Sequence, residues 1–323
     1  MIPLSPHRRS TPPSRAWLAV SLGSGRGEEL RGRIARLQPW ADAVELRLDL
    51  LPEPVPEAVL QDPPLPTVIT YRPRREGGRY EGPEAQRLAT LRSLAERFPI
   101  TALDVEWDAV DNLGPVQVPR IVSRHYFDRF PRAVESAWEH LAHLGGEIVK
   151  LAATTHTLEE TLRLCSLFLQ ADRPTILIAM GDTGLLSRLI APFYPAAYLT
   201  YAAPTREQAV APGQIAVQDM HNRYHVHRLH PGSDLIGYLA LDAHRSPLIP
   251  HYNQKWAQSG EDRVLLPLAP TREDALDNVI ARAWELGFQR LWVAPPLTTA
   301  LGLGEEAVWL LPTGEPMPIW TWP

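Results

Sequence analysis

The sequence predicts an α/β protein whose larger part is a (β/α)8 TIM barrel, followed by a small α/β domain. Short β-rich runs recur at intervals of roughly 20 to 30 residues, and amphipathic helical patterns lie between several of them. Eight such alternations in about 200 residues are typical of a compact parallel barrel. Because periodicity does not reveal closure, an open doubly wound sheet is the alternative, although no glycine-rich dinucleotide fingerprint follows the early strands.

The predicted strands are short runs rich in apolar and β-branched residues, and the first of them, WLAVSL, is apolar almost throughout. In chain order they are 17–22, 43–48, 67–71, 101–106, 120–123, 147–152, 175–180 and 197–201. Apolar residues that recur with the helical period predict helices between them, at 27–37, 84–98, 133–144, 158–170 and 183–191.

Length and composition limit the class of protein. The chain has 323 residues and a net charge of -5, with both signs interspersed, so we expect no nucleic-acid partner. A single cysteine, Cys165, excludes an intramolecular disulfide and is expected to be a buried small residue in a reducing compartment. No apolar run reaches about 18 residues, which predicts no membrane span. Residues 1–15 lack the apolar core of a signal peptide, so we expect a flexible tail and a cytoplasmic protein.

Ionisable residues gather at the carboxyl ends of the predicted strands, where barrel active sites lie. In the second strand Glu45, Arg47 and Asp49 recur with period two, so they share one face. An isolated pair of inward charges is often structural, but such residues at five successive strand ends indicate a catalytic centre. The later ones are Arg72 and Glu76, Asp104 and Glu106, Arg124 and His125, Lys150, and Arg188 after the seventh strand.

Lysine is nearly absent from the chain. Of 32 basic side chains only Lys150 and Lys255 are lysines. Lys150 lies within the otherwise apolar run EIVKLA, where a charged amine costs on the order of several kcal/mol unless it is paired, neutralised or used in chemistry. Arginine cannot replace a lysine that acts as a neutral amine. From this residue alone, both a Schiff-base lysine and a strand-end lysine reaching toward solvent stay open.

Seven motifs follow one another along the barrel region: AVELRLD, TYRPRREGG, LDVEWD, VSRHYFD, IVKLA, MGDTGLLSR and APGQI. With them the chain resembles the type I 3-dehydroquinate dehydratases, the Schiff-base class of the shikimate pathway, over roughly residues 16–220. This resemblance implies a hydro-lyase that converts 3-dehydroquinate into 3-dehydroshikimate in chorismate and aromatic amino acid biosynthesis. It implies a small-molecule substrate and no cofactor, and a homodimer stays open.

The resemblance also implies roles for residues. Lys150 is expected to form the imine with the substrate ketone, and His125 to act as general acid and base. Arg188 is expected to hold the substrate carboxylate, with Gln214 on the closing loop 211–214. The other expected site residues are Glu45, Arg47 and Arg72 on the ring hydroxyls, Met180 and Tyr201 as further substrate-binding residues, Glu76 and Glu106 as catalytic partners, and Asp49 and Asp104 behind them.

The chemistry of these residue types supports the roles independently. Removing water from a β-hydroxy ketone requires loss of a proton beside the carbonyl, and an iminium makes that proton more acidic. A histidine can take the proton near neutral pH, and a nearby carboxylate, Glu106 or Glu76, would fix its tautomer. Arginine binds a carboxylate with two hydrogen bonds and so orients the substrate. His125, Glu106 and Asp104 could hold a metal ion, but a lysine electrophile makes one unnecessary, and we expect no metal.

The lid differs from the family pattern. Val210 stands where the family usually has serine, and the segment 202–209 is about two residues longer. We expect the lid to close through Gln214 while Val210 offers the substrate no hydroxyl. Tyr201 replaces the phenylalanine that is frequent in the family.

The segment 223–231 reads as a linker between 16–222 and 232–323. His225, His227 and His230 within it are expected to be solvated rather than to form a metal site. The string at 235–256 resembles the opening of the substrate-binding domain of shikimate dehydrogenase, and 291–295 resembles the strand before that family's catalytic lysine.

The residues that this dehydrogenase uses are replaced. His244 stands where the first carboxylate-binding serine is expected, and only Ser246 remains; Val293 and Leu297 replace a threonine and the lysine. The sequence stops before a nucleotide-binding domain begins. We therefore expect 232–323 to be a noncatalytic relic without shikimate dehydrogenase activity, with an unrelated small α/β module as the alternative.

Two other classes of function stay open at this point. One is another lysine-dependent barrel enzyme such as a class I aldolase, which would share Lys150 but not need His125 with the Arg-Glu-Gly-Gly loop. The other is a noncatalytic protein that senses a pathway metabolite through a retained pocket.

Overall fold

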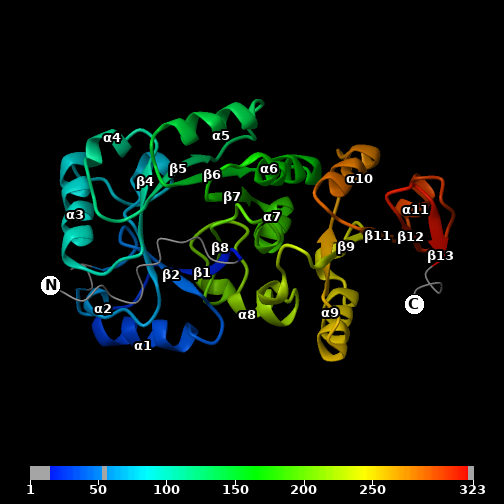
Figure 1. Cartoon of the computed structure of the whole chain (residues 1–323), viewed down its shortest axis with the longest axis horizontal. Coiled ribbons are helices and arrows are strands. Elements are labelled where there is room, and N and C mark those ends of the chain that lie inside the picture. The colour runs from blue at the N-terminus through cyan, green and yellow to red at the C-terminus, as the bar shows by residue number, and fades with distance from the viewer. Residues whose placement is uncertain (1–14, 53–56, 319–323) are drawn as a thin grey trace.

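The computed structural model describes residues 15–52 and 57–318 (Figure 1). The expected tail therefore lies outside the described residues, apart from Arg15. Eight parallel strands form one sheet in the order β7-β6-β5-β4-β3-β2-β1-β8. The Thr175 N–H donates to Ala196 O, and the Tyr198 N–H donates to Thr175 O, which joins the two edges of the sheet. The nearly closed (β/α)8 barrel is thus confirmed, and the open doubly wound sheet is excluded.

The strands of the barrel are β1 (Trp17–Leu22), β2 (Ala43–Arg47), β3 (Thr67–Thr70), β4 (Ala102–Glu106), β5 (Arg120–Tyr126), β6 (Ile148–Thr154), β7 (Thr175–Met180) and β8 (Leu199–Ala202). β5 extends beyond the predicted Ser123 because Arg124, His125 and Tyr126 continue the ladder with β6. Their polar side chains end the apolar pattern, but the backbone pairing does not depend on that pattern.

The helices around the barrel are α1 (Gly27–Leu37), α2 (Glu57–Gln61), α3 (Glu84–Arg97), α4 (Val110–Leu113), α5 (Val134–His143), α6 (Leu158–Gln170), α7 (Leu185–Ile190) and α8 (Val217–Asn222). α2, α4 and α8 were not predicted because each is too short for a helical period to be visible. The helix expected at 183–191 consists of α7 with short 3₁₀ turns at Asp182–Gly184 and Ala191–Phe193. Cys165 is fully buried in α6.

The barrel interior changes from apolar to ionisable along the strands. Ala102 on β4 and Ile148 on β6 belong to an inner apolar cluster. Two residues further along the same strands lie Asp104 and Lys150, both buried. Because side chains alternate between the two faces of a strand, these later residues share the inner face and gather at the carboxyl end of the barrel.

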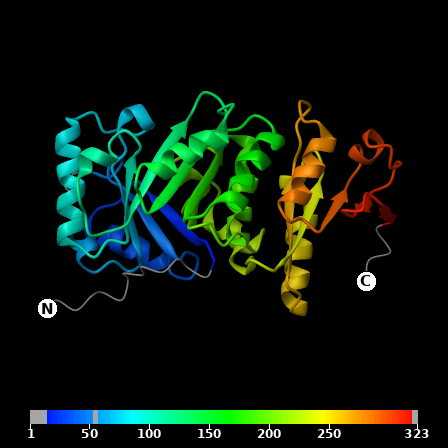
Figure 2. The same cartoon turned by 45° about the horizontal axis from the view of Figure 1, so that its top comes forward.

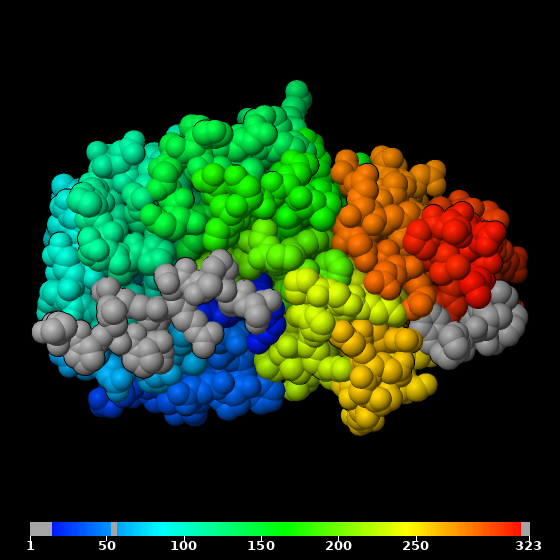
Figure 3. Space-filling model, viewed as in Figure 1, coloured from blue at the N-terminus to red at the C-terminus, as the bar shows by residue number. Residues whose placement is uncertain are grey.

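A second sheet follows the barrel, in the order β10-β9-β11-β12-β13. It is parallel from β10 to β11 and antiparallel beyond. We call residues 232–318 the C-terminal domain; it lies beside α6 and α7 of the barrel (Figures 1 and 2), and the surface is continuous across the junction (Figure 3). Its elements are β9 (Asp234–Leu239), α9 (Leu248–Ser259), β10 (Arg263–Leu268), α10 (Leu276–Glu285), β11 (Arg290–Val293), α11 (Leu297–Ala300), β12 (Val308–Leu310) and β13 (Pro316–Pro318).

The segment 223–231 packs more closely than a solvated linker. Tyr224, Val226 and Leu229 are buried, because this otherwise polar string carries apolar side chains at positions that face the core. The ring of His227 stacks on that of His221, with centroids 4.3 Å apart. Within the described ranges, no group of histidines, cysteines or acidic residues could hold a metal ion, and no helix is long and apolar enough to cross a membrane.

Candidate active site

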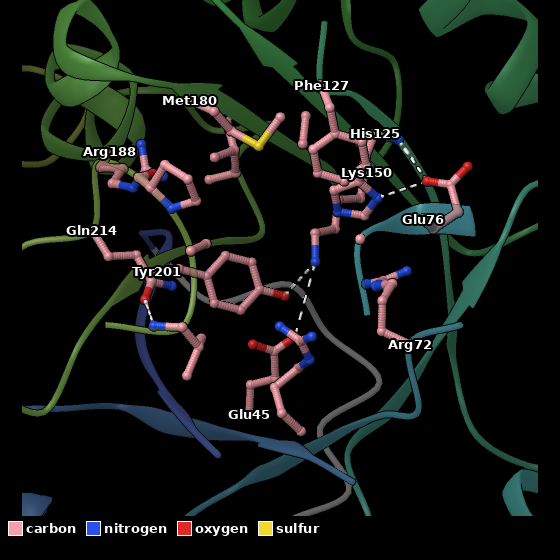
Figure 4. Close-up of a pocket in the computed structure, with 17 residues that line it drawn as sticks. Glu45, Arg72, Glu76, His125, Phe127, Lys150, Met180, Arg188, Tyr201 and Gln214 are labelled. Atoms are coloured by element: carbon pink, nitrogen blue, oxygen red, sulfur yellow. Dashed lines mark hydrogen bonds and ion pairs between the residues drawn. The ribbon is translucent and has the colours of Figure 1, made fainter. Parts of the chain in front are cut away.

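A pocket opens at the carboxyl ends of the barrel strands (Figure 4). Among the residues predicted for the site, those that line it are Glu45, Arg47, Arg72, Glu76, His125, Lys150, Met180, Arg188, Tyr201 and Gln214. Asp49, Asp104 and Glu106 do not line it and lie behind it. The lining residues that were not predicted for the site are Gly77, Phe127, Ala152 and Ile178. Ala211 and Pro212 were expected as part of the closing loop, and Val210 as a difference from the family pattern in the lid.

Lys150 extends from β6 into the centre of the pocket and is 5% exposed. Its Nζ lies 2.6 Å from Asp104 Oδ2, 4.0 Å from Glu45 Oε1 and 3.3 Å from the hydroxyl of Tyr201. Burial opposes ionisation of Asp104, but Arg72 and Lys150 outweigh it and hold the pKa of its carboxyl well below its usual range. An ionised Asp104 therefore compensates the buried amine.

Two hydroxyls hold the carboxylate of Glu45 in place. Ser21 Oγ donates to one of its oxygens at 2.6 Å, and Thr70 Oγ1 donates to the other at 2.7 Å. Neither residue was predicted, although both are polar residues on inward-facing positions of strands. With both oxygens bonded, Glu45 is fixed at the pocket wall.

Arg72 ties the acidic residues behind the pocket together. Its guanidinium lies 2.7 Å from Asp104 Oδ1 and 2.7 Å from Glu106 Oε1, and it donates to Ser123 Oγ at 2.8 Å. Glu106 also lies 2.6 Å from Nη2 of Arg87, a fully buried arginine on α3. A buried charge is destabilising without a partner. Removing one side chain of this network would therefore leave another buried charge unpaired.

His125 pairs with Glu76, not with Glu106. The Oε2 atom of Glu76 lies 2.9 Å from both the backbone N and the Nδ1 of His125. The ring of Phe127 stacks on the imidazole at a centroid distance of 5.7 Å. Burial, with Arg72 and Lys150 nearby, holds the pKa of His125 well below its usual value, and burial raises the pKa of Glu76 to about 7. A neutral imidazole is therefore available as a base.

Arg188 lies opposite the histidine and is 1% exposed. Its guanidinium donates to the carbonyls of Ala179 at 2.5 Å and Pro212 at 3.2 Å, while its Nε has no hydrogen-bond partner. Within the described ranges no carboxylate pairs with it, and burial lowers its pKa to about 10. This buried cation is thus available for an anionic ligand.

The lid segment lies over the pocket. The Oε1 of Gln214 accepts the Val210 N–H at 3.0 Å, and its Nε2 donates to Ser21 Oγ at 3.3 Å. Behind the pocket, the carboxylate of Asp49 accepts two hydrogen bonds from the Arg47 side chain and one from the backbone N–H of Arg72. These bonds position Gln214, Arg47 and Arg72, which all line the pocket.

The fold and the site define a (β/α)8-barrel protein with a buried lysine, a histidine–glutamate pair and a buried arginine under a lid. Residues 18–231 match the family model of type I 3-dehydroquinase. The chain belongs to this family.

Curated relatives agree with this assignment. The chain is 31% identical over 224 residues to an Arabidopsis thaliana protein named bifunctional 3-dehydroquinate dehydratase/shikimate dehydrogenase, chloroplastic; the match covers 65% of this chain and 37% of that protein. It is 35% identical over 184 residues to 3-dehydroquinate dehydratase of Methanothrix thermoacetophila, covering 56% of this chain and 79% of the relative.

Solved structures share the fold. 3-Dehydroquinate dehydratase from Aquifex aeolicus aligns with a TM-score of 0.53 at 26% identity, over 63% of this chain and 94% of that one. The dehydroquinate dehydratase and shikimate dehydrogenase from S. pombe aligns with a TM-score of 0.55 over 94% of this chain and 64% of that one. At 18% identity this second likeness shows the fold alone, and it extends over the C-terminal domain.

Proposed function

We propose that this protein is a 3-dehydroquinate dehydratase that works through an imine on Lys150. The observation that carries the proposal is the pairing of two buried cations in one pocket. Lys150 presents an amine to a ketone, while Arg188, which has no carboxylate partner in the described chain, presents a guanidinium to a carboxylate. A substrate that carries both groups is held at two points and therefore in one orientation.

The residues around Lys150 support its role as the electrophile carrier. Its nitrogen attacks the ketone carbon, water leaves, and a cationic iminium remains on the nitrogen. Asp104, 2.6 Å from Nζ, compensates that charge. The iminium withdraws electrons from the adjacent carbon and makes its proton easier to remove.

His125 is the base that takes this proton. When Glu76 is ionised it accepts a hydrogen bond from Nδ1, so the proton stays on Nδ1 and Nε2 keeps its lone pair. The resulting imidazolium then protonates the leaving hydroxyl. Hydrolysis of the remaining imine releases the product and restores the Lys150 amine.

The function is tested by incubating the full chain with 3-dehydroquinate and following the absorbance of the enone product. We expect turnover, and we expect it to disappear in Lys150→Met, whose unbranched side chain is one atom shorter than that of lysine and has no amine. Lys255→Met is the matched control and should turn over as the unaltered protein does. Turnover that survives Lys150→Met would refute the imine mechanism, and no turnover by the unaltered protein would refute the function.

A further inference from the structure

The hydroxyl of Tyr201, on β8, contacts Nζ of Lys150, the nitrogen that attacks the ketone in the proposed mechanism (Figure 4). Its oxygen lies 3.3 Å from Lys150 Nζ, and its ring centroid lies 4.5 Å from the same atom. The side chain is 4% exposed. The hydroxyl and the amine therefore meet inside the barrel, away from bulk water.

Other hydroxyls of this cluster are engaged with carboxylates. Ser21 and Thr70 donate to Glu45, and Ser123 donates to Asp104. In the described part of the chain, Tyr201 supplies the hydroxyl that contacts the amine directly. This distinction matters because an ionised carboxylate only accepts hydrogen bonds, whereas a hydroxyl both accepts and donates.

We propose that Tyr201 is a further catalytic residue, which acts in the formation of the imine. Its hydroxyl accepts a hydrogen bond from the Lys150 ammonium before reaction and donates one to the oxygen that leaves as the imine forms. This inference rests on the proposed function, because it requires Lys150 to attack the substrate ketone.

The step balances without an outside reactant. The nitrogen gives up a proton and bonds to the ketone carbon, the carbon–oxygen π bond breaks, and the oxygen becomes the hydroxyl of a carbinolamine. The remaining carbon–oxygen bond then breaks, the oxygen leaves as water with a second proton from the nitrogen, and the iminium keeps the third. The departing oxygen is two bonds from Nζ, so a hydroxyl that contacts Nζ can also reach that oxygen.

The surroundings keep the Tyr201 hydroxyl protonated. Burial, with the carboxylates of Glu45 and Asp104 nearby, raises its pKa well above the usual value. It therefore donates a hydrogen bond at neutral pH and does not lose its proton. Both protons of the released water come from the Lys150 nitrogen. The hydrogen bond from Tyr201 stabilises the oxygen that receives them.

Tyr198 offers a matched control. It immediately precedes β8, is 8% exposed and belongs to the inner apolar cluster, where its ring contacts Trp17. Among the described residues no hydrogen bond joins its hydroxyl to Lys150. Tyr198→Phe thus removes a buried tyrosine hydroxyl from the same barrel without touching the amine.

The experiment measures how fast the imine forms in the full chain. Protein is mixed with 3-dehydroquinate, quenched with borohydride at increasing times, and the reduced adduct is quantified by intact mass. We expect Tyr201→Phe to slow adduct formation about 2- to 12-fold, the effect of one neutral hydrogen bond. We expect the same final amount of adduct, and the rate of Tyr198→Phe should equal that of the unaltered protein.

Three outcomes would overturn the role of Tyr201. They are an unchanged rate in Tyr201→Phe, equal slowing in Tyr198→Phe, and a fall in the melting temperature of Tyr201→Phe well beyond that of Tyr198→Phe, which would make the hydroxyl a structural group. Failure of the proposed function looks different, because the unaltered protein would then form no adduct at all.

Discussion

Asp274 of the C-terminal domain caps a helix of the barrel, and replacing it tests whether the two parts stabilise each other. Its carboxylate accepts the backbone N–H of Leu158 at 3.0 Å and of Glu159 at 2.7 Å, at the start of α6. The next N–H, of Glu160, is bonded by the hydroxyl of Thr157. Asp274→Ala therefore leaves two N–H groups of α6 without their partner.

The expected cost is worked from these two bonds, although Asp274→Ala also removes the bonds that its carboxylate accepts from the N–H and the hydroxyl of Thr271 in its own domain, at 2.7 and 3.0 Å. Loss of a capping side chain costs about 0.5–2 kcal/mol, and loss of a negative charge at a helix N-terminus costs about 0.3–1 kcal/mol. We expect the free energy of unfolding to fall by about 1–3 kcal/mol. An unfolding entropy of about 2.1 cal/mol/K per residue converts this, for 323 residues, into a melting temperature lower by about 1–4 °C.

The assay is thermal unfolding of the full chain, with Glu273→Ala as the control because Glu273 is an exposed neighbour of the same charge. Asp274→Asn should lie between the two, since an amide oxygen still accepts a hydrogen bond but carries no charge. If Asp274→Ala melts at the same temperature as Glu273→Ala, the capping contact contributes nothing to stability, and the C-terminal domain does not stabilise α6 through it.

Three further predictions concern the site and the domain. His125→Ala should lower kcat by about 10²- to 10⁴-fold while borohydride still traps the imine; near-normal turnover would assign the base to another residue. Because burial raises the pKa of Glu76 to about 7, its carboxylate is lost as pH falls through that value, and kcat/KM should fall with it. In Glu76→Gln this fall should be absent, and a fall that persists would contradict the role of Glu76. A chain that ends at Asn222 should unfold at a lower temperature than the full chain, because it loses the hydrogen bond from Tyr194 to Leu286 O along with the Asp274 cap. Equal melting temperatures would mean that the C-terminal domain does not stabilise the barrel.

The alternation of side chains along strands was enough to predict which residues share the inner face of the barrel. Glu45 and Lys150 could be placed in one pocket because each is an ionisable residue on the inward face of its strand. The fold class followed from the repeated alternation of strands and helices, and the structure confirms it.

Pairings between side chains were not visible in the sequence. Glu76 and Glu106 were equal candidates for the partner of His125, because the choice depends on the 3₁₀ turn Arg74–Glu76, which carries Glu76 over the pocket. Arg87 was missed for a related reason: an arginine on an amphipathic helix is usually exposed, whereas here it is buried and pairs with Glu106. Such contacts depend on barrel closure and on loop geometry, which a periodic pattern does not encode.

In the proposed function Lys150 forms an imine with 3-dehydroquinate, and the chain's two lysines make this step directly testable. After borohydride reduction in the presence of the substrate, peptide mapping by mass spectrometry should place the adduct on Lys150. Lys255, an exposed lysine on α9, serves as the internal control and should stay unmodified. An adduct on Lys255 or the N-terminal amine instead of Lys150, or no adduct while the substrate is being consumed, would contradict imine formation on Lys150.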